Sequence, residues 1–277
     1  MGIFTKETKE EFYDAPYLHQ ADRATLKALK AIPGFSALLK AFMKIWSEKT
    51  ILIQNMSSNL RVSEKQLTKY YEMLLPICEK LDIKVPQMYV TLDVVPNAYT
   101  IGDENPCVVL TSGLIENFPD ELIKTVIAHE CGHIACHHSL YTTMGRIILD
   151  GGIEFLGLSQ LITLPLQMAF SYWMRCSEFS ADRAAAFCDD SAENIIDMCM
   201  RFSGYDRDFG IPANKEAFLE QAYEYRKLVE GSAWNKTLEF LILKDMNHPF
   251  NAIRALEAKE WVESDFYKKL TTGEEIE

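Results

Sequence analysis

The chain has 277 residues, of which 48% are hydrophobic and 25% are charged, and its net charge is −12. This composition is that of an ordinary globular protein, long enough to bury a sizeable core in one large domain or two small ones. A nucleic-acid-binding protein is expected to carry a strong basic patch, so the acidity of the chain argues against nucleic acid as a partner.

The seven cysteines are scattered along the chain and form no C-x-x-C pair. An odd number without such pairs is more typical of a reducing compartment than of a disulfide framework. Residues 1–11 are rich in acidic side chains and lack the apolar run of a secretory signal. We therefore expect a cytoplasmic location.

Residues 1–18 are polar, and the segment from 21 to 49 has the pattern of amphipathic helices. Beyond the Pro33-Gly34 break, apolar residues recur at helical spacing, at Phe35, Leu38, Leu39, Phe42, Ile45 and Trp46. The segment also holds six basic residues against two acidic ones. Packing on the rest of the protein with the lysines in solvent is the favoured interpretation, and peripheral contact with an anionic membrane is the alternative. We expect residues 1–60 to form an arm and helices packed on a domain formed by residues 61–277.

The next part of the chain predicts a helix followed by a small antiparallel sheet. Ser63 can cap a helix over residues 64–81, in which Pro76 marks a kink or break. Three short apolar and β-branched runs follow, at residues 88–92, 97–101 and 107–111. A further helix should begin at Pro119-Asp120 and end near His138, and the remaining chain has helical patterns. The expected fold class is α+β and mostly helical.

The helix that begins at Asp120 contains the sequence His129-Glu130-Cys131-Gly132-His133, an H-E-x-x-H motif. Histidines four residues apart share one helix face, so both rings can bind the same metal ion. Glu130 lies about 100° around the helix from His129, where its carboxylate can take a proton from an attacking water. Two imidazoles and a carboxylate base are typical of a zinc hydrolase. A third ligand from the same straight helix would lie too far along its axis, so we expect His137 and His138 to have a structural role near the end of the helix.

Residues 155–174 carry no formal charge, and 20 residues is the length of a membrane span. A single crossing would place His133 and any ligand after residue 174 on opposite sides of the bilayer. Two crossings would need about 40 residues, and the preceding stretch contains several charged side chains. We therefore interpret the segment as a buried helical hairpin or an apolar cleft wall, with a surface resting on a membrane as the alternative.

A catalytic zinc ion requires a third protein ligand. Downstream, Glu178 and Asp182 are four residues apart in a strongly helical stretch, so their side chains point the same way. Glu178 can bind the metal, and Asp182 can accept the free ring N–H of a ligand histidine. A solvated helix face is the ordinary alternative for such a pair. Small residues around it, among them Ser180 and Ala181, favour close helix packing and therefore burial.

At this point the sequence resembles the HtpX and CAAX-prenyl-protease family of zinc metallopeptidases, of the gluzincin type. Besides H-E-x-x-H, four ordered elements carry the resemblance: Asn97-Ala98-Tyr99, Val109 to Leu114, Glu178 to Arg183, and Asn247-His248-Pro249 with Arg254. The similarity covers roughly residues 86–256. It implies a zincin-like fold with an active-site H-E-x-x-H helix in residues 61–277. The long transmembrane pairs of HtpX and the prenyl proteases are missing, so the sequence is similar to a soluble branch.

The resemblance implies an endopeptidase with one Zn²⁺ per chain, bound by His129, His133 and Glu178. Glu130 would be the catalytic base, and the substrate would be a peptide or an unfolded protein. We expect the substrate to add as a strand to the backbone of Asn97, Ala98 and Tyr99.

Two later residues have open roles. His248 is the candidate donor to the developing oxyanion; it can instead cap a helix, or occupy the open zinc position and keep the enzyme latent. Arg254 can hold the carboxylates of Glu178 and Asp182 or stabilise the transition state, and an ordinary surface arginine is the alternative. Two other functions stay open: a non-catalytic interaction protein that keeps the fold and the metal, and an enzyme held latent by its N-terminal helices.

Overall fold

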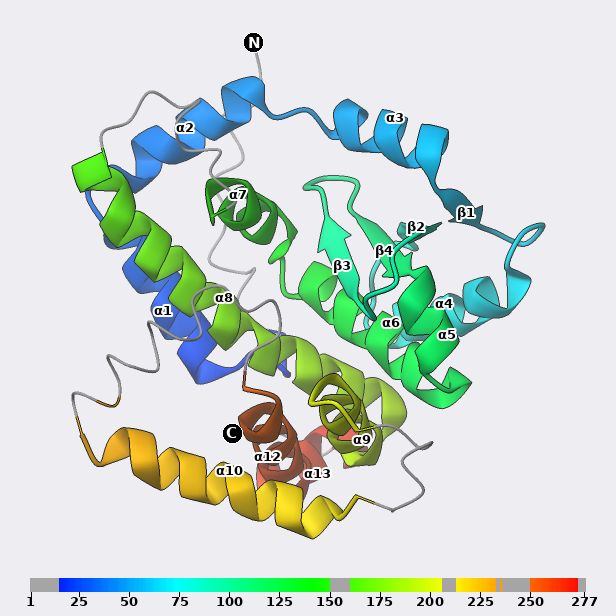
Figure 1. Ribbon diagram of the computed structural model, residues 1–277, viewed down its shortest axis with the longest axis vertical. Helices are drawn as coiled ribbons and strands as arrows, with labels where there is room; N and C mark the ends of the chain where they lie inside the picture. The colour runs from blue at the N-terminus through cyan, green and yellow to red at the C-terminus, as the bar shows by residue number, and fades with distance from the viewer. Residues whose placement is uncertain (1–14, 150–159, 206–212, 233–234, 236–249, 274–277) are drawn as a thin grey trace.

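The computed structural model describes residues 15–149, 160–205, 213–232, 235 and 250–273. Helices predominate, and a small sheet lies between α3 on one side and α6 on the other (Figure 1). The described elements are α1 (Gln20–Ala31), α2 (Phe35–Ile45), α3 (Glu48–Ser58), β1 (Leu60–Val62), α4 (Thr68–Lys80), β2 (Gln87–Thr91), β3 (Ala98–Ile101), β4 (Cys107–Thr111), α5 (Ser112–Asn117), α6 (Asp120–Ala135), α7 (Ser139–Leu149), α8 (Gln160–Asp189), α9 (Glu193–Phe202), α10 (Lys215–Glu230), α12 (Asn251–Glu263) and α13 (Asp265–Thr272). The α+β, mostly helical class is confirmed.

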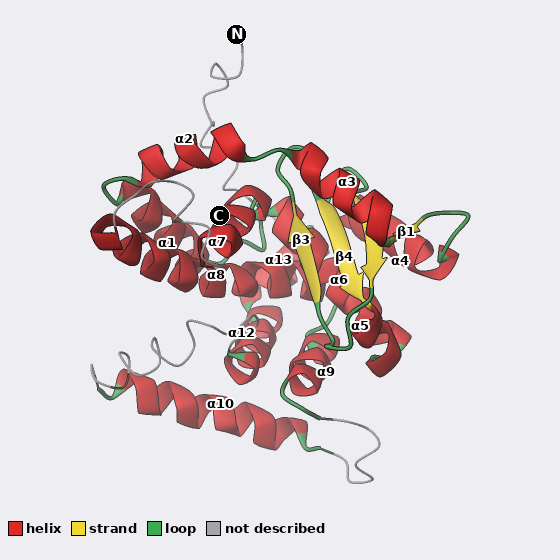
Figure 2. Cartoon of the chain, turned by 45° about the horizontal axis from the view of Figure 1, so that its top comes forward, coloured by secondary structure: helices red, strands yellow, loops and turns green. Residues whose placement is uncertain are grey.

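The sheet is mixed, whereas the sequence predicted an antiparallel one. Its strand order is β1-β2-β4-β3, and the central pair β2 and β4 is parallel (Figure 2). The predicted hairpin of β3 and β4 is present, but β3 pairs on the far side of β4 and leaves β2 to pair with β4 in parallel. The three-residue strand β1 was missed because it is too short to show an alternating pattern. Among the described strands, β3 therefore forms one edge of the sheet.

The inner face of the sheet builds the main core against α4 and α6. Alternate residues of the central strands point inward and pack on both helices, among them Met88, Val90, Val108 and Leu110 of the sheet with Leu74 and Ile77 of α4 and Val126 and Ile127 of α6. On the outer face, Tyr89 and Val109 pack with Ile51 of α3. This arrangement fixes α6 against the sheet, so that one side of α6 can face α8.

Helices α1 and α2 pack against α7 and α8 in a second apolar cluster. Its buried members come from all four helices: Leu26, Leu29, Phe35, Leu38, Phe42, Met144, Ile148, Leu166, Phe170 and Trp173. Arg23, Lys27 and Lys40 are exposed, as the packing interpretation of residues 21–49 expects. The two segments that suggested membrane contact thus bury apolar side chains against each other, and peripheral membrane contact stays a prediction.

Two helices differ from the sequence-based expectation. Residues 160–174 are the first half of α8, which continues without a turn to Asp189, so no hairpin interrupts this part of the described chain. Within the described residues, none of the helices has the length and hydrophobicity that a membrane crossing requires. Helix α4 begins at Thr68 rather than after Ser63, because residues 63–66 form a turn and Leu67 adopts a left-handed conformation (φ 57°).

Candidate metal centre

Helices α6 and α8, which carry the candidate metal ligands His129, His133 and Glu178, approach each other closely. At the contact, a Cβ atom on Gly132 would lie 2.7 Å from the Cβ of Ala184 and 3.0 Å from the Cα of Ala181. The first distance is shorter than carbon atoms tolerate and the second is tight, so a residue larger than glycine would push the two helices apart. The small residues of α8 were recognised in the sequence, but the matching role of Gly132, between the two histidines, was not.

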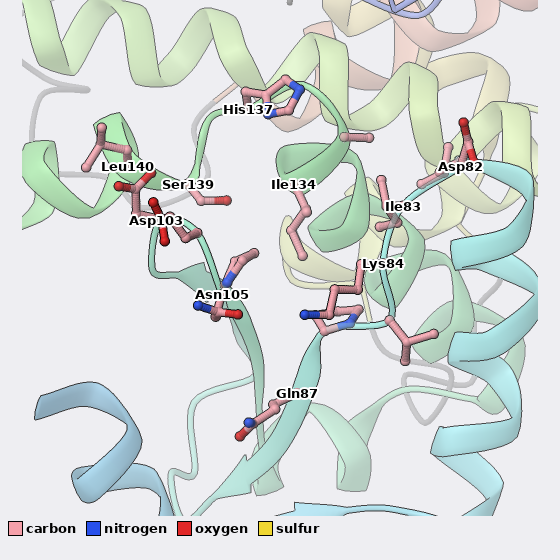
Figure 3. Close-up of a pocket in the computed structure, with 16 residues that line it drawn as sticks. Asp82, Ile83, Lys84, Gln87, Asp103, Asn105, Ile134, His137, Ser139 and Leu140 are labelled. Carbon is pink, nitrogen blue, oxygen red and sulfur yellow. The ribbon is translucent and has the colours of Figure 1, made fainter. Parts of the chain in front are cut away.

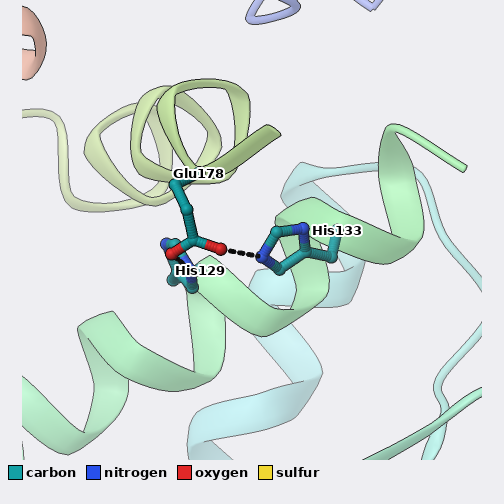
Figure 4. Close-up of side chains that lie close together, drawn as sticks. All are labelled: His129, His133 and Glu178. Atoms are coloured by element: carbon teal, nitrogen blue, oxygen red, sulfur yellow. Dashed lines mark ion pairs between the residues drawn. The ribbon is translucent and has the colours of Figure 1, made fainter. Parts of the chain in front are cut away.

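His129 and His133 of α6 and Glu178 of α8 converge on one point between the helices (Figure 4). The Nε2 atom of His129 lies 3.5 Å from Oε2 of Glu178, and Nε2 of His133 lies 3.4 Å from Oε1. All three side chains are buried, and their candidate ligand atoms lie within 4.8 Å of one another. The structure therefore brings together the three residues that the sequence assigned to a metal ion.

The geometry of these donors fits a tetrahedral zinc ion. Zinc binds imidazole nitrogen and carboxylate oxygen at about 2.0–2.2 Å, so two donors at a tetrahedral angle lie roughly 3.4 Å apart. The two nitrogen-to-oxygen distances of 3.4 and 3.5 Å are close to this separation, each to a different oxygen of the Glu178 carboxylate, and the three candidate ligand atoms lie within 4.8 Å of one another. Each histidine also directs Nε2 toward the shared point and Nδ1 away from it, which leaves the second nitrogen for a supporting hydrogen bond.

Asp182 and Arg254 support one side of the cluster. The Nδ1 atom of His129 lies 2.9 Å from Oδ1 of Asp182, and Arg254 donates two hydrogen bonds of 2.7 Å to the same carboxylate. The guanidinium also lies 3.1 Å from Oε2 of Glu178. With an exposed fraction of 1%, Arg254 holds both carboxylates of α8 and is not a surface residue.

Neighbouring charges shift the pKa values of His129 and Asp182 in the metal-free protein. Burial alone would lower the pKa of His129, but hydrogen bonds to Asp182 and Glu178 and their negative charges raise it to about 9. Burial alone would raise the pKa of Asp182, but the charge and hydrogen bonds of Arg254 hold it below its ordinary value. Asp182 is therefore an ionised acceptor that favours a proton on Nδ1 of His129.

Glu130 is buried beside the cluster and is held by the edge strand. The hydroxyl of Thr100 in β3 lies 2.8 Å from Oε2 of Glu130 and 3.0 Å from its carbonyl oxygen. Thr100 was not singled out in the sequence, where it is an ordinary β-branched residue of a predicted strand. The hydroxyl fixes the direction of the carboxylate that the sequence assigned as the base.

His133 has a support of its own, which the sequence did not reveal. Its Nδ1 atom lies 3.0 Å from Nδ1 of His138, and Nε2 of His138 lies 2.8 Å from Oδ2 of Asp22 in α1. Helix α6 ends at Ala135 rather than near His138, because His137 adopts a left-handed conformation with φ of 56° and turns the chain back. Asp22 lies more than 100 residues before the motif, so no local pattern connects the two.

The remaining predicted residues have a weaker connection with the cluster. Ala98 and Tyr99 begin the edge strand β3 and Asn97 precedes it, and the hydrogen bond of this strand to Glu130 comes from Thr100, one residue further on. The ring of Tyr99 is covered by the guanidinium of Arg146 at 5.4 Å. His248 lies outside the described residues, so its role stays a prediction.

A separate cavity of about 580 Å³ opens at the far end of α6 (Figure 3). Asp82 and Lys84, Asp103 of the β3–β4 connection and His137 beyond α6 are among its lining residues. None of His129, Glu130, His133 and Glu178 lines it, so this cavity is not the metal site.

Comparison with known proteins places this geometry in a family. The profile of peptidase family M48 matches residues 63–262. The plastoglobule-localized metallopeptidase 48 of Arabidopsis thaliana, a chloroplastic protein, is 31% identical over 92% of this chain and 74% of its own length. Protease HtpX homolog 2 of Methanosarcina mazei is 26% identical over 61% of this chain and 66% of its own length. The HtpX homolog of Campylobacter concisus is 25% identical over 63% and 69%, respectively.

No solved structure matches the chain. The family match spans the H-E-x-x-H helix, the helix that carries Glu178 and the segment that carries Arg254. The chain therefore belongs to peptidase family M48 and is a metallopeptidase.

Proposed function

We propose that the protein is a zinc endopeptidase in which His129, His133 and Glu178 bind a single zinc ion. The observation that carries this proposal is the convergence of two Nε2 atoms and one carboxylate at separations suited to tetrahedral zinc. Two neutral imidazoles and one carboxylate are a common ligand set of catalytic zinc, which keeps the fourth position for water. The carboxylate of Asp182 and the guanidinium of Arg254 keep His129 and Glu178 in place.

Glu130 acts as the general base. Bound zinc supplies Lewis acidity, which lowers the pKa of water toward about 7. Glu130 accepts the proton of the attacking water and returns it to the leaving amine. The burial of Glu130 and its contact with Thr100 support this role, because a carboxylate already held in one rotamer loses little conformational freedom in the reaction.

The substrate is a peptide or protein segment that binds as an added strand along β3. Among the described strands, β3 pairs only with β4, so its second edge carries no strand. Helix α7 reaches the end of this edge, where Thr143 hydrogen-bonds the backbone of Gly102, so the substrate would pair with the part of the strand before it. Its contact with Glu130 through Thr100 connects this edge to the base. Backbone pairing tolerates many sequences, so we expect broad specificity. His248, as donor to the oxyanion or as a group that keeps the enzyme latent, and a cytoplasmic location stay predictions.

The test compares the full chain with its Glu130→Gln variant. We expect about one zinc ion per chain in both proteins, casein cleavage by the wild type, and a loss of at least about 100-fold in the variant, because the base is removed. Glu116→Gln, an exposed glutamate of α5, is the matched control and should keep both zinc and activity.

Three results would contradict the proposal. A wild type that binds no zinc removes the metal site, and cleavage retained by Glu130→Gln removes the base. Zinc in the wild type without any cleavage would instead support a latent or non-catalytic protein.

A further inference from the structure

The two candidate histidine ligands are supported differently. Nδ1 of His129 reaches the carboxylate of Asp182 directly, at 2.9 Å. Nδ1 of His133 meets another imidazole, that of His138, at 3.0 Å. A neutral imidazole carries one N–H and one acceptor nitrogen, and its other hydrogen-bond partner decides which nitrogen carries the proton. The support of His133 therefore depends on what holds His138.

The backbone brings His138 next to His133. The N–H of His138 donates to the carbonyl of His133, and the N–H of His137 donates to that of Ile134, at 2.9 and 3.0 Å. With His137 in the left-handed region, these two bonds form the Schellman motif that ends α6. The side chain of His138 is thereby directed back along the helix that carries the metal ligands.

Asp22 of α1 holds the other side of His138. Its Oδ2 atom lies 2.8 Å from Nε2 of His138 and 2.6 Å from the hydroxyl of Ser180, and its Oδ1 atom accepts a 2.8 Å hydrogen bond from Nε1 of Trp173. The carboxylate is buried, with an exposed fraction of 1%. A buried carboxylate is costly unless donors surround it, and here three donors from α8 and the α6–α7 turn do so.

The direction of these hydrogen bonds suits metal binding. An ionised Asp22 only accepts, so Nε2 of His138 carries the proton and its Nδ1 is an acceptor. Nδ1 of His133 then donates to His138, which leaves the lone pair on Nε2 of His133, the atom that lies 3.4 Å from Glu178. The same tautomer is required of a histidine that binds zinc through Nε2.

A purely structural role for Asp22 would be to fasten α1 to α8. The contacts with Trp173 and Ser180 already do this, because both residues belong to α8. The contact with His138 adds no link between α1 and α8, since His138 lies in the turn after α6. It does connect α1 with the metal cluster.

We propose that Asp22 is a positioning residue for the metal site, which fixes the tautomer and orientation of His133 through His138 and so makes the N-terminal helix α1 part of that site. This inference rests on the proposed role of His133 as a zinc ligand. The chain then has two supports of matching function, Asp182 for His129 and Asp22 with His138 for His133.

The test measures zinc dissociation constants by chelator competition in the full chain. Asp22→Asn and His138→Phe should each raise the dissociation constant by about 10- to 100-fold, the usual effect of losing such a support. Leu29→Ala is the control: it removes buried packing of α1 but leaves the hydrogen bonds of Asp22 and His138 in place, so its dissociation constant should stay within about threefold of the wild type. The melting temperatures of the metal-free proteins report the loss of packing separately.

A double variant checks that Asp22 acts through His138. In the His138→Phe background, Asp22→Asn should weaken zinc binding no further, because residues in one path are not additive. Wild-type zinc affinity in both single variants would overturn the proposal, even if their melting temperatures fall. A wild type without zinc affinity would instead overturn the zinc assignment itself.

A measurement on the wild type keeps the proposal testable if the variants do not fold. In the zinc-loaded protein labelled with ¹⁵N at histidine, we expect His138 to carry its proton on Nε2 alone. A proton on Nδ1 of His138 would overturn the proposal, because His133 would then have no acceptor.

Discussion

The hydroxyl of Thr100 lies 2.8 Å from Oε2 of Glu130, so the edge strand of the sheet holds the carboxylate of the H-E-x-x-H motif. Both residues are buried, at 2% and 1% exposure. In the proposed function, β3 pairs with the substrate and Glu130 is the base, so the side chain of Thr100 would link the two.

We expect Thr100→Val to reduce kcat by about 10- to 100-fold, because the near-isosteric valine leaves Glu130 without the donor that fixes its direction. KM and zinc content should change little, since neither the strand backbone nor a metal ligand is altered. Steady-state kinetics with a fluorogenic peptide and metal analysis check this. Thr143→Val is the control, because Thr143 is a buried threonine whose hydroxyl contacts Gly102 and not Glu130. An unchanged kcat in Thr100→Val would show that Glu130 needs no such support.

Gly132→Ala tests the contact between α6 and α8. The new methyl group would meet Ala184 at 2.7 Å and the backbone of Ala181 at 3.0 Å, so the helices must separate and carry Glu178 away from the histidines. We expect a loss of about 1–3 kcal/mol in the free energy of unfolding, offset in part by the better helix propensity of alanine, together with weaker zinc binding.

Denaturant unfolding and chelator competition measure both effects. Gly145→Ala in α7 is the control: its methyl group meets the Sδ atom of Met174 at 2.7 Å and the ring of Phe170 at 3.2 Å, both side chains and not backbone, and the flexible Met174 can move aside. If Gly132→Ala is as stable and binds zinc as tightly as Gly145→Ala, the close approach is not what brings the ligands together.

Replacing the buried Arg254 should lower the stability of the protein more than replacing an arginine that forms ion pairs on the surface. Arg254→Met leaves Asp182 and Glu178 buried without their cation, and loss of one partner of a buried ion pair costs about 3–5 kcal/mol. Arg254→Lys keeps the charge but not the two parallel bonds to Asp182, so we expect an intermediate loss of stability and zinc affinity.

Arg226→Met provides the comparison, because Arg226 pairs with Glu257 and Glu260 on a partly exposed surface and should contribute less than about 1 kcal/mol. Thermal unfolding of the metal-free proteins measures the difference. Equal losses in the variants of Arg254 and Arg226 would count against the anchoring role of Arg254.

The sequence alone predicts which side chains share one face of a helix. The spacing of His129 and His133, and that of Glu178 and Asp182, places each pair on one helix face, and helices of this length keep such a register. The sequence left three roles open for Arg254, because its contacts with Asp182 and Glu178 depend on how α12 packs. The parallel pairing of β2 and β4 was missed, since local patterns do not specify which strands become neighbours.

Thr100 and Asp22 were missed for a different reason. Each contacts the site across a long separation in sequence, through a single hydrogen-bonding atom, and neither belongs to a motif with a fixed spacing. Asp22 was read as one of two acidic residues in a basic amphipathic segment, and only the packing of α1 on α8 shows that it is buried. Residues of this kind follow from tertiary structure and not from local pattern.

The raised pKa of His129 predicts how zinc binding depends on pH. In the metal-free protein this pKa is about 9, above the ordinary value of 6.5, so His129 is protonated at pH 7.5. Zinc requires the lone pair on Nε2 and therefore displaces one proton below pH 9. The apparent zinc affinity should rise about tenfold for each pH unit between 7 and 8.5 and level off near 9.

The stability of the metal-free fold should change in the opposite direction. A group whose pKa is raised by folding stabilises the fold fully below its unfolded pKa, and this contribution is lost as the pH rises through the folded pKa. Here the loss falls between pH 6.5 and about 9. Asp182→Asn removes the main hydrogen-bonded carboxylate that raises the pKa of His129, so both pH dependences should become shallower. Calorimetry in two buffers of different ionisation enthalpy should detect about one proton released per zinc at pH 7.5. A zinc affinity that does not change between pH 7 and 8.5 would show that His129 is already neutral in the metal-free protein.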